Sequence, residues 1–250
     1  MFENMIDIHS HILPMVDDGA SSVKMALDML DEAYQDGTDE IILTPHLAYP
    51  YGFINPKEKI NDLFDDLKRI IKYEGIPIKV YLGCEYLFTD ERSFELQFND
   101  ISLLNNTRYL LMEFYFDVDQ EDILKAIDCV LNKNLIPIIA HPERFDCIQD
   151  NEELIHMIVN KGALLQMNKG SILSRYGSTI KHTCEYILEH HYYSFVGSDA
   201  HNINKRTSLM YDAYDYIKNV YGHHYANKIF KENPKKMLED IDIRKESKHD

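Results

Sequence analysis

Short apolar segments alternate with amphipathic helical segments along almost the whole chain, and this alternation limits the folds that it can adopt. The apolar run at 5–9, for example, is followed at 21–37 by a segment with apolar residues at helical spacing. Such pairs recur about seven times, which predicts parallel strands covered by helices. The sequence contains neither GxGxxG nor GxxxxGKS/T, which disfavours the two commonest nucleotide-binding folds. We therefore expect an α/β protein with a barrel rather than an open dinucleotide-binding sheet.

Length and composition fit one globular unit. A chain of 250 residues can bury a full core, and no linker, repeat or low-complexity tract divides it, so we expect a single domain over 1–250 with a frayed tail from about 244. No apolar run approaches the roughly 20 residues of a membrane span, and we find no signal peptide. The four cysteines are scattered, which favours free thiols in a cytoplasmic protein.

The formal net charge of the chain is −16. Because nucleic-acid affinity depends on neutralising many phosphates, this charge argues against nucleic acid as a partner. A local pocket for anions is still compatible with it, since bound divalent cations would offset part of the negative charge.

Metal-competent side chains follow nearly every predicted strand, always at the same end. In chain order they are His9, His11, His46, Glu85, Glu113, His141, Asp199 and His201. In a closed parallel barrel the C-terminal ends of all strands point to one face, where such folds place their chemistry. We therefore expect these residues to meet in one pocket.

Each of these residues, taken singly, also has a purely structural explanation. A short HxH match arises by chance, His46 fits a hydrogen-bonded loop residue, and Asp199 fits a helix cap. Independent accidents do not explain why they all fall at the same strand ends, where burying an ionisable group is costly unless it is paired or metal-bound. We assign the seven other histidines to packing or to the surface: His156, His182, His190, His191, His223, His224 and His249.

Two adjacent aspartates follow the HxH pair. We expect one of Asp17 and Asp18 to reach the metal and the other to cap the turn before Gly19. Imidazoles combined with carboxylates and no thiolate suit Mn²⁺, Fe²⁺ or Zn²⁺ in a catalytic site better than a structural zinc site. The number of candidate ligands exceeds what one ion needs and suffices for two or three.

Two arginines lie in loops on the predicted metal face. Arg144 comes three residues after His141, and Arg206 comes five residues after His201. Guanidinium groups match phosphate oxygens in a bidentate manner, although either arginine also fits a surface ion pair in so acidic a chain. A metal cluster beside arginine points to a phosphate ester rather than an amide as substrate.

The motifs "DIHSHILPMVDDG", "TPH", "GCE", "MEF", "AHPER" and "GSDAH" together resemble the polymerase-and-histidinol-phosphatase (PHP) superfamily. Within it, the chain is most similar to the bacterial manganese-dependent tyrosine-protein phosphatases of capsule and exopolysaccharide gene clusters. The resemblance extends from Ile6 to Arg206, and its most specific parts are "IDIHSHILP" joined to "DDG", and "AHPER".

The resemblance implies a distorted (β/α)7 barrel, similar to a TIM barrel, with a trinuclear metal site at the C-terminal ends of the strands. Manganese would be the metal, with Fe²⁺, Zn²⁺, Co²⁺ or Mg²⁺ as alternatives. It implies phosphate binding by Arg144 and Arg206, which with His141 and Asp199 are the candidate catalytic residues. The implied ligands are His9, His11, Asp18, His46, Glu85, Glu113, His141, Asp199 and His201, with Asp17 as the alternative to Asp18.

The predicted function is hydrolysis of phosphotyrosine by attack of a metal-bound hydroxide, without a covalent enzyme intermediate. The resemblance implies as partner a phosphotyrosine protein, namely a cognate bacterial tyrosine kinase with a tyrosine-rich tail. Rival hypotheses are a PHP phosphatase of a small ester such as histidinol phosphate, a metal-dependent amidohydrolase or PHP exonuclease, and a non-catalytic metal-binding regulatory module. The arginines disfavour the amidohydrolase, and the net charge disfavours the exonuclease.

Overall fold

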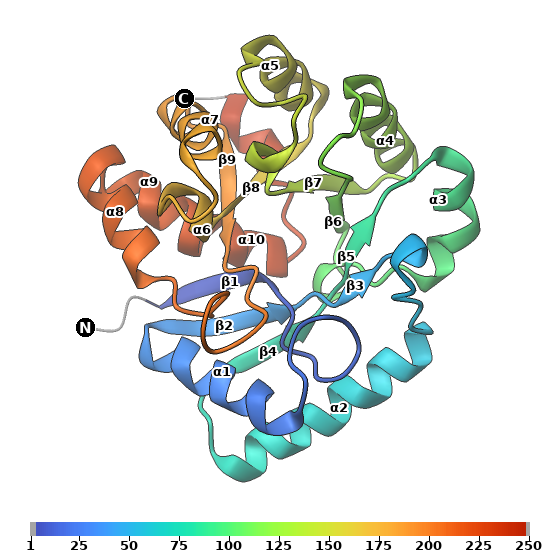
Figure 1. The fold of residues 1–250 in the computed structure, drawn as a ribbon, viewed down its shortest axis with the longest axis vertical. Helices are drawn as coiled ribbons and strands as arrows, with labels where there is room; N and C mark the ends of the chain where they lie inside the picture. The colour runs from blue at the N-terminus through green and yellow to red at the C-terminus, as the bar shows by residue number, and fades with distance from the viewer. Residues whose placement is uncertain (1–3, 249–250) are drawn as a thin grey trace.

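The computed structural model describes residues 4–248, which form a mixed α/β fold of parallel strands with helices packed outside them (Figure 1). The predicted α/β class is therefore confirmed. The strands are β1 (Met5–Ser10), β2 (Thr38–Leu43), β3 (His46–Leu47), β4 (Lys79–Leu82), β5 (Glu85–Leu87), β6 (Tyr109–Glu113), β7 (Ile136–Ala140), β8 (Leu164–Asn168) and β9 (Tyr193–Gly197).

The helices alternate with the strands and continue beyond the last one. The α-helices are α1 (Val23–Gln35), α2 (Lys57–Glu74), α3 (Glu91–Gln97), α4 (Gln120–Asn132), α5 (Glu152–Lys161), α6 (Lys169–Ile172), α7 (Ser178–Glu189), α8 (Tyr211–Tyr221), α9 (His223–Asn227) and α10 (Asn233–Leu238). Among the described residues, no helix is both long and apolar enough to cross a membrane.

The strands form two parallel sheets rather than the single closed barrel that was expected. One sheet has the order β1-β2-β4 and the other the order β3-β5-β6-β7-β8-β9. The division arises because two predicted strands are each interrupted near their ends, one between β2 and β3 at Thr44–Pro45 and the other between β4 and β5 at Gly83–Cys84. Pro45 has no N–H for a ladder hydrogen bond, and Gly83 packs so closely on Leu104 that a Cβ would lie 2.5 Å from its Cδ2.

Backbone hydrogen bonds nevertheless bridge the two interruptions, and others join the sheets at their opposite edges, β1 and β9. Glu85 N–H donates to the carbonyl of Pro45 (3.2 Å), and Gly83 N–H donates to the carbonyl of Leu43 (2.9 Å). Beyond the ends of β1 and β9, Asp199 N–H donates to the carbonyl of His9 (2.8 Å). The ends of strands from both sheets are thus held side by side.

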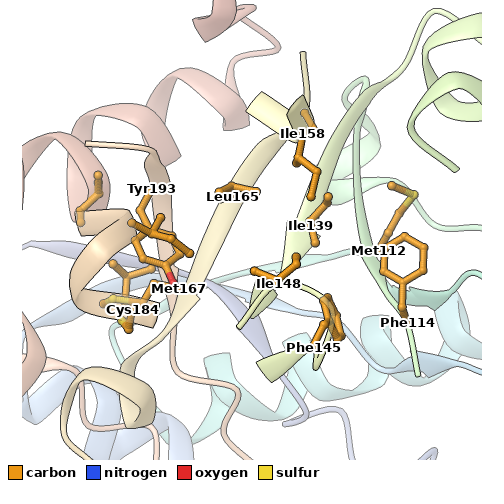
Figure 2. Close-up of a cluster of buried hydrophobic side chains, with 14 of the residues drawn as sticks. Met112, Phe114, Ile139, Phe145, Ile148, Ile158, Leu165, Met167, Cys184 and Tyr193 are labelled. Carbon is orange, nitrogen blue, oxygen red and sulfur yellow. The ribbon is translucent and has the colours of Figure 1, made fainter. Parts of the chain in front are cut away.

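Apolar side chains pack both inside and outside this arrangement. One cluster brings together inward-facing residues of both sheets, including Ile8 of β1, Ile42 of β2, Ile138 of β7 and Phe195 of β9. A second and larger cluster fills the space between the six-stranded sheet and its helices (Figure 2). In α4, for example, Ile123, Ala126, Ile127 and Val130 face this cluster at helical spacing.

Two segments differ from the sequence-based expectation. The segment before β6, expected to be irregular, contains α3, whose first turn is capped by Asp90 accepting from Ser93 N–H (2.9 Å). The tail expected to fray from about 244 has a 3₁₀ helix at Ile243–Lys248, and Ile243 packs on the inner cluster. Residues 249 and 250, including the end of the predicted tail, lie outside the described residues.

Gly197 at the end of β9 is required by close packing, and its replacement tests the fold near the strand ends. A Cβ at Gly197 would lie 2.6 Å from His9 Cβ and 2.8 Å from Gln166 Nε2. We expect Gly197→Ala to lower the free energy of unfolding by about 1–3 kcal/mol because these side chains must shift, as measured by urea denaturation. Ser194→Ala on the same strand should cost far less, and equal stability of the two variants would contradict this packing.

Candidate metal centre

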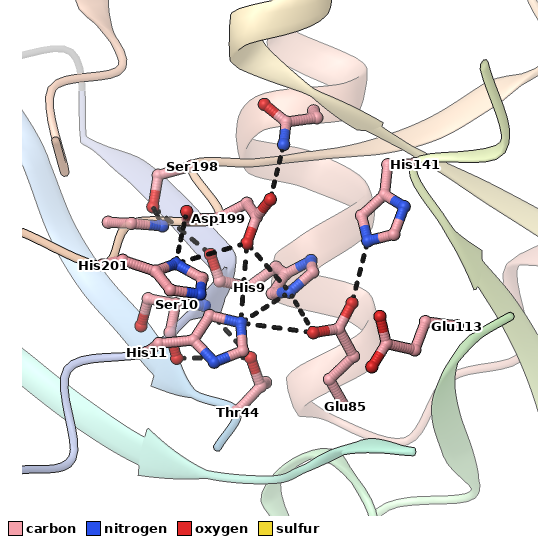
Figure 3. A network of polar contacts seen from close by, with 12 residues as sticks. His9, Ser10, His11, Thr44, Glu85, Glu113, His141, Ser198, Asp199 and His201 are labelled. Carbon is pink, nitrogen blue, oxygen red and sulfur yellow. Dashed lines mark hydrogen bonds and ion pairs between the residues drawn. The ribbon is translucent and has the colours of Figure 1, made fainter. Parts of the chain in front are cut away.

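All nine ligands implied by the family resemblance lie together where the strands end. Figure 3 labels His9, His11, Glu85, Glu113, His141, Asp199 and His201 among them. Their nitrogen and oxygen atoms form four overlapping groups, within each of which the candidate ligand atoms lie no more than 4.8 Å apart. The groups are His11–Asp18–His46–His201, His9–His11–Asp199, His9–Glu85–His141 and His46–Glu85–Glu113. Because His9, His11, His46 and Glu85 each belong to two groups, the arrangement has the shape of a multinuclear site.

Glu85 is the centre of the cluster. Its side chain is 1% exposed, and four imidazoles approach it. Glu85 Oε2 lies 3.1 Å from His9 Nε2, 3.2 Å from His11 Nε2 and 3.2 Å from His46 Nδ1, while Oε1 lies 2.9 Å from His141 Nε2. Glu85 is thus shared by two of the ligand groups, as expected of a bridging carboxylate.

Three histidines present the same nitrogen to the cluster because an acceptor holds the other one. His9 Nδ1 lies 2.9 Å from Gln166 Oε1, and His11 Nδ1 lies 2.8 Å from Asp17 Oδ2. His201 Nδ1 lies 3.0 Å from the carbonyl oxygen of Asp199. These acceptors require a proton on Nδ1, so Nε2 is the nitrogen that faces the cluster, as in protein metal sites.

The donor set fits divalent cations better than it fits a network of hydrogen bonds. His46 Nδ1 lies 2.9 Å from Glu113 Oε1, and His201 Nε2 lies 3.4 Å from Asp18 Oδ1. Both nitrogens are buried, yet neither has a partner in hydrogen-bond alignment. Buried polar atoms without partners are costly. Metal ions between these nitrogens and the nearby carboxylates would give both kinds of atom a partner.

The electrostatics of the cluster favour cations. Burial alone would lower the pKa of His46, but the carboxylates of Glu85 and Glu113 outweigh burial and raise it to about 10. Likewise, burial opposes the positive charge of His9, while Glu85 and Asp199 raise its pKa to about 9. The negative field that retains these protons would also attract divalent ions, which compete with protons for the same nitrogen atoms.

The two adjacent aspartates have different environments. Asp17 is buried; its Oδ2 accepts from the backbone N–H of His46 (3.0 Å) as well as contacting His11, and its Oδ1 accepts from Gly19 N–H (2.9 Å). Asp18 is more exposed and belongs to a candidate ligand group, with Oδ1 near His201 and His46. Asp17 thus stabilises the turn and orients His11, whereas Asp18 lies among the candidate ligands.

Residues of β8 that sequence reasoning missed orient the candidate ligands. Gln166 contacts His9 Nδ1, and Asn168 Nδ2 donates to Asp199 Oδ2 (2.7 Å). Asn168 was detectable in principle, because it ends its strand as the ligands end theirs. Gln166 was a polar residue in the middle of an apolar strand, which is a weaker signal.

The loop that carries His141 and Arg144 is fixed by a buried carboxylate. Glu143 accepts from Tyr193 Oη (2.8 Å), Ser171 Oγ (2.6 Å) and the backbone N–H of Asn168 (3.0 Å). His141 itself has a left-handed backbone with φ of +35°. A non-glycine residue in that conformation needs support from its surroundings, which Glu143 supplies by fastening the loop to β8 and β9.

Both predicted phosphate-binding arginines point at the cluster. Arg144 Nη1 lies 3.4 Å from Asp199 Oδ2, and Arg206 Nη2 lies 2.6 Å from Asp199 Oδ1. Both guanidinium groups are partly exposed, whereas Asp199 is buried. Neither arginine is therefore in the surface ion pair that was the alternative explanation.

Lys169 is a further residue that the sequence did not single out. It is buried, and Nζ donates to the backbone carbonyls of Thr207 and Leu209, directly after Arg206. Burial lowers the pKa of Lys169 to about 8. Its contacts hold the segment that carries Arg206.

The histidines assigned to packing or to the surface are absent from the four candidate ligand groups found among the described residues. His156, for example, lies between two tyrosine hydroxyls, 2.7 Å from Tyr192 Oη and 3.3 Å from Tyr186 Oη. His249 lies outside the part of the chain that the structure describes.

Comparison with known proteins shows extended similarity. Residues 5–239 match the family described as capsular polysaccharide synthesis, CpsB/CapC. The chain is 32% identical over 241 residues to the tyrosine-protein phosphatase CpsB of Streptococcus pneumoniae, covering 94% of this chain and 99% of that protein. It is 36% identical over 220 residues to the tyrosine-protein phosphatase YwqE of Bacillus subtilis, covering 87% and 85%.

A solved structure is also similar over nearly its whole length. It comes from crystallographic work on YwqE from Bacillus subtilis and CpsB from Streptococcus pneumoniae, described as unique metal-dependent tyrosine phosphatases. The TM-score is 0.87 at 32% sequence identity, and the alignment covers 95% of each chain.

The different environments of Asp17 and Asp18 predict different effects on metal binding. Asp18→Asn should remove a ligand and with it one ion, or most of the affinity for that ion. Asp17→Asn should keep the stoichiometry and weaken Mn²⁺ binding by roughly 10–100-fold, as expected for a residue that orients a ligand. Titration calorimetry with Mn²⁺ measures both quantities, and Asp28→Asn on α1 is the control. The opposite ranking would make Asp17 the ligand.

Proposed function

The chain belongs to the capsular polysaccharide synthesis family CpsB/CapC, and from this membership we propose that it is a metal-dependent tyrosine-protein phosphatase. Such an enzyme is a phosphoric monoester hydrolase. The activities named for its relatives support the proposal over most of the chain's length. The observation that supports the proposal most directly is that Arg144 and Arg206 both contact Asp199, at the edge of four overlapping ligand groups.

The proposed substrate-binding step uses the two arginines as a clamp. Their guanidinium groups contact Asp199 from two sides, and from there each presents N–H donors to the adjacent space. A phosphate dianion held against the cluster would accept charge-assisted hydrogen bonds from both. Developing charge on the phosphoryl oxygens would be stabilised by donors already in place.

When bound, divalent ions supply a hydroxide nucleophile near neutral pH and neutralise phosphoryl oxygens. The proposed ligands are the nine residues of the four groups, with Gln166, Asp17 and Asn168 holding three of them in orientation. The tyrosine phenolate, with a pKa of about 10, is a far better leaving group than an alkoxide, so it needs little help from a protein acid.

A thiol nucleophile is not part of this proposal. Burial raises the pKa of the Cys84 thiol to about 12 and the pKa of the Cys184 thiol well above its usual range. The pKa values of Cys129 and Cys147 are raised as well, chiefly by burial. Since the thiolate is the reactive form, none of the four cysteines has the environment of a catalytic nucleophile.

We also propose the physiological substrate, the cellular location and the metal ion of the reaction. The substrate is a phosphotyrosine protein, specifically the tyrosine-rich tail of a cognate bacterial tyrosine kinase that regulates capsule or exopolysaccharide synthesis, and the chain acts in the cytoplasm. The family description supports the link to capsular polysaccharide. Mn²⁺ is the proposed ion because the donors are imidazoles and carboxylates without thiolate.

The proposal includes a single domain built as a distorted seven-stranded barrel. Pairing β2 with β3, and β4 with β5, as continuations of one another reduces nine short strands to seven. The backbone hydrogen bonds across the interruptions and at the β1 and β9 edges, together with the apolar cluster shared by the two sheets, support this arrangement.

Metal removal tests the proposed function. After chelation and desalting, we expect hydrolysis of a phosphotyrosine peptide to fall to background and to return when Mn²⁺ is added, because the ions supply the nucleophile. Histidinol phosphate assayed in parallel should be turned over much more slowly. Full activity of the metal-free chain would refute a metal-dependent mechanism, and faster turnover of histidinol phosphate would assign the site to small esters.

Substitution of Arg144 separates phosphate binding from metal binding. Arg144→Lys keeps the charge but loses the bidentate fork, so kcat/KM for a phosphotyrosine peptide should fall roughly 10–100-fold, the range of a charged hydrogen bond. Metal content, measured by elemental analysis, should stay at the wild-type value. Arg69→Lys on the exposed face of α2 is the matched control. Loss of metal from Arg144→Lys would make the arginine structural.

A further inference from the structure

Aromatic side chains gather on the loops that follow two of the candidate ligands. Tyr51 lies in the turn after His46, while Tyr115 and Phe116 follow Glu113. Tyr51 is 59% exposed and Phe116 is 49% exposed. Large exposed apolar side chains that cluster beside a charged pocket suggest a binding surface.

The turn after β3 places Tyr51 at this position. Ala48 and Phe53 are joined by two backbone hydrogen bonds of 3.1 and 3.2 Å, and Gly52 adopts φ of +79°, which favours glycine. The ring of Phe53 stacks on His46, with centroids 5.5 Å apart and an angle of 9° between the planes. One end of the turn is thus anchored on a candidate ligand, while Tyr51 at its tip stays exposed.

Tyr51 is connected to the loop after β6 through an aromatic contact. Its ring meets the ring of Tyr115 edge to face, with centroids 5.8 Å apart. Phe116, the next residue, has its carbonyl held by the N–H of Asp146 (2.8 Å) in the loop that follows Arg144. The three aromatic residues therefore form a continuous rim between the His46 side and the Arg144 side of the cluster.

Phe116 also faces the phosphate clamp. The guanidinium carbon of Arg144 lies 4.7 Å from the ring centre of Phe116 and 4.8 Å from that of Tyr176. Arg144 is held between two aromatic faces, while Phe116 keeps about half of its surface exposed. An aromatic group attached to a phosphate on Arg144 would emerge beside this exposed surface.

We propose that Tyr51, Tyr115 and Phe116 form an aromatic collar that receives the phenyl ring of the substrate and selects aryl over alkyl phosphate esters. This inference rests on the proposed phosphatase function and names the residues that determine its specificity. The metal ligands and arginines recognise only the phosphoryl group, which all phosphate monoesters share. Ring-to-ring contacts at the collar supply the discrimination that the charged part of the site lacks.

Two non-hydrolysable analogues isolate the role of the ring. Phenylphosphonate and methylphosphonate carry the same anionic group and differ in whether a phenyl ring is attached. On the Mn²⁺-loaded chain, we expect Tyr51→Ala to raise the inhibition constant of phenylphosphonate about fivefold, the size of one aromatic contact, and to leave that of methylphosphonate unchanged. Tyr51→Phe should restore the wild-type value for phenylphosphonate.

Further variants control for indirect effects. Tyr73→Ala removes an 87% exposed tyrosine from α2 and should change neither constant. Phe116→Leu should weaken both phosphonates, because its ring also contacts Arg144.

The experiment distinguishes failure of the aromatic collar from failure of the proposed phosphatase function. If the wild-type chain hydrolyses phosphotyrosine but Tyr51→Ala affects both phosphonates equally, or neither, the collar is refuted and the phosphatase function stands. If the metal-loaded wild-type chain hydrolyses no phosphate ester, the proposed function fails, and the inference fails with it.

Discussion

The buried carboxylate of Glu85 is the group on which the arrangement of the site depends. It is surrounded by imidazoles and nearly excluded from water, in an environment where an unpaired charge would be strongly destabilising. Contact with the histidines holds the pKa of Glu85 well below its usual range in spite of burial. The fold therefore accepts a charged group at its centre only because cationic partners, protons or metal ions, are close by. Loss of these partners would leave several carboxylates repelling one another at the ends of the strands.

This constraint explains why the backbone around the site is unusual. His141 and Asp199 both have positive φ, and both follow a strand whose regular geometry would direct the next side chain elsewhere. Both are supported from β8: the N–H of Asn168 donates to Glu143 in the His141 loop, and the side-chain amide of Asn168 donates to Asp199. The interrupted strands near His46 and Glu85 belong to the same pattern, since Pro45 and Gly83 end the regular pairing immediately before the ligands. Regular strands bring the candidate ligands to one face, and the irregular backbone at the strand ends orients their side chains toward the cluster.

The sequence was most informative where a residue able to bind metal stood at the end of a predicted strand. The implied ligands were identifiable because imidazoles and carboxylates recurred at the ends of apolar runs, and the family resemblance rested on the same residues. Gln166 and Glu143 were not identifiable in this way, because their roles depend on partners far along the chain, His9 and Tyr193. The division into two sheets was missed for a similar reason. Periodicity marks an extended segment, but whether its hydrogen bonds continue past Pro45 depends on the neighbouring strand.

The balance of charge at the strand ends suggests an order of binding. Five carboxylates, those of Asp17, Asp18, Glu85, Glu113 and Asp199, lie beside two guanidinium groups and beside imidazoles whose pKa values are raised. Without divalent ions, these charges leave no surplus of positive charge for a phosphate dianion. Two or three divalent ions would replace the imidazole protons and add positive charge to the pocket. Metal binding thus supplies the surplus of positive charge that a phosphate dianion needs, which makes it a precondition for substrate binding as well as for catalysis.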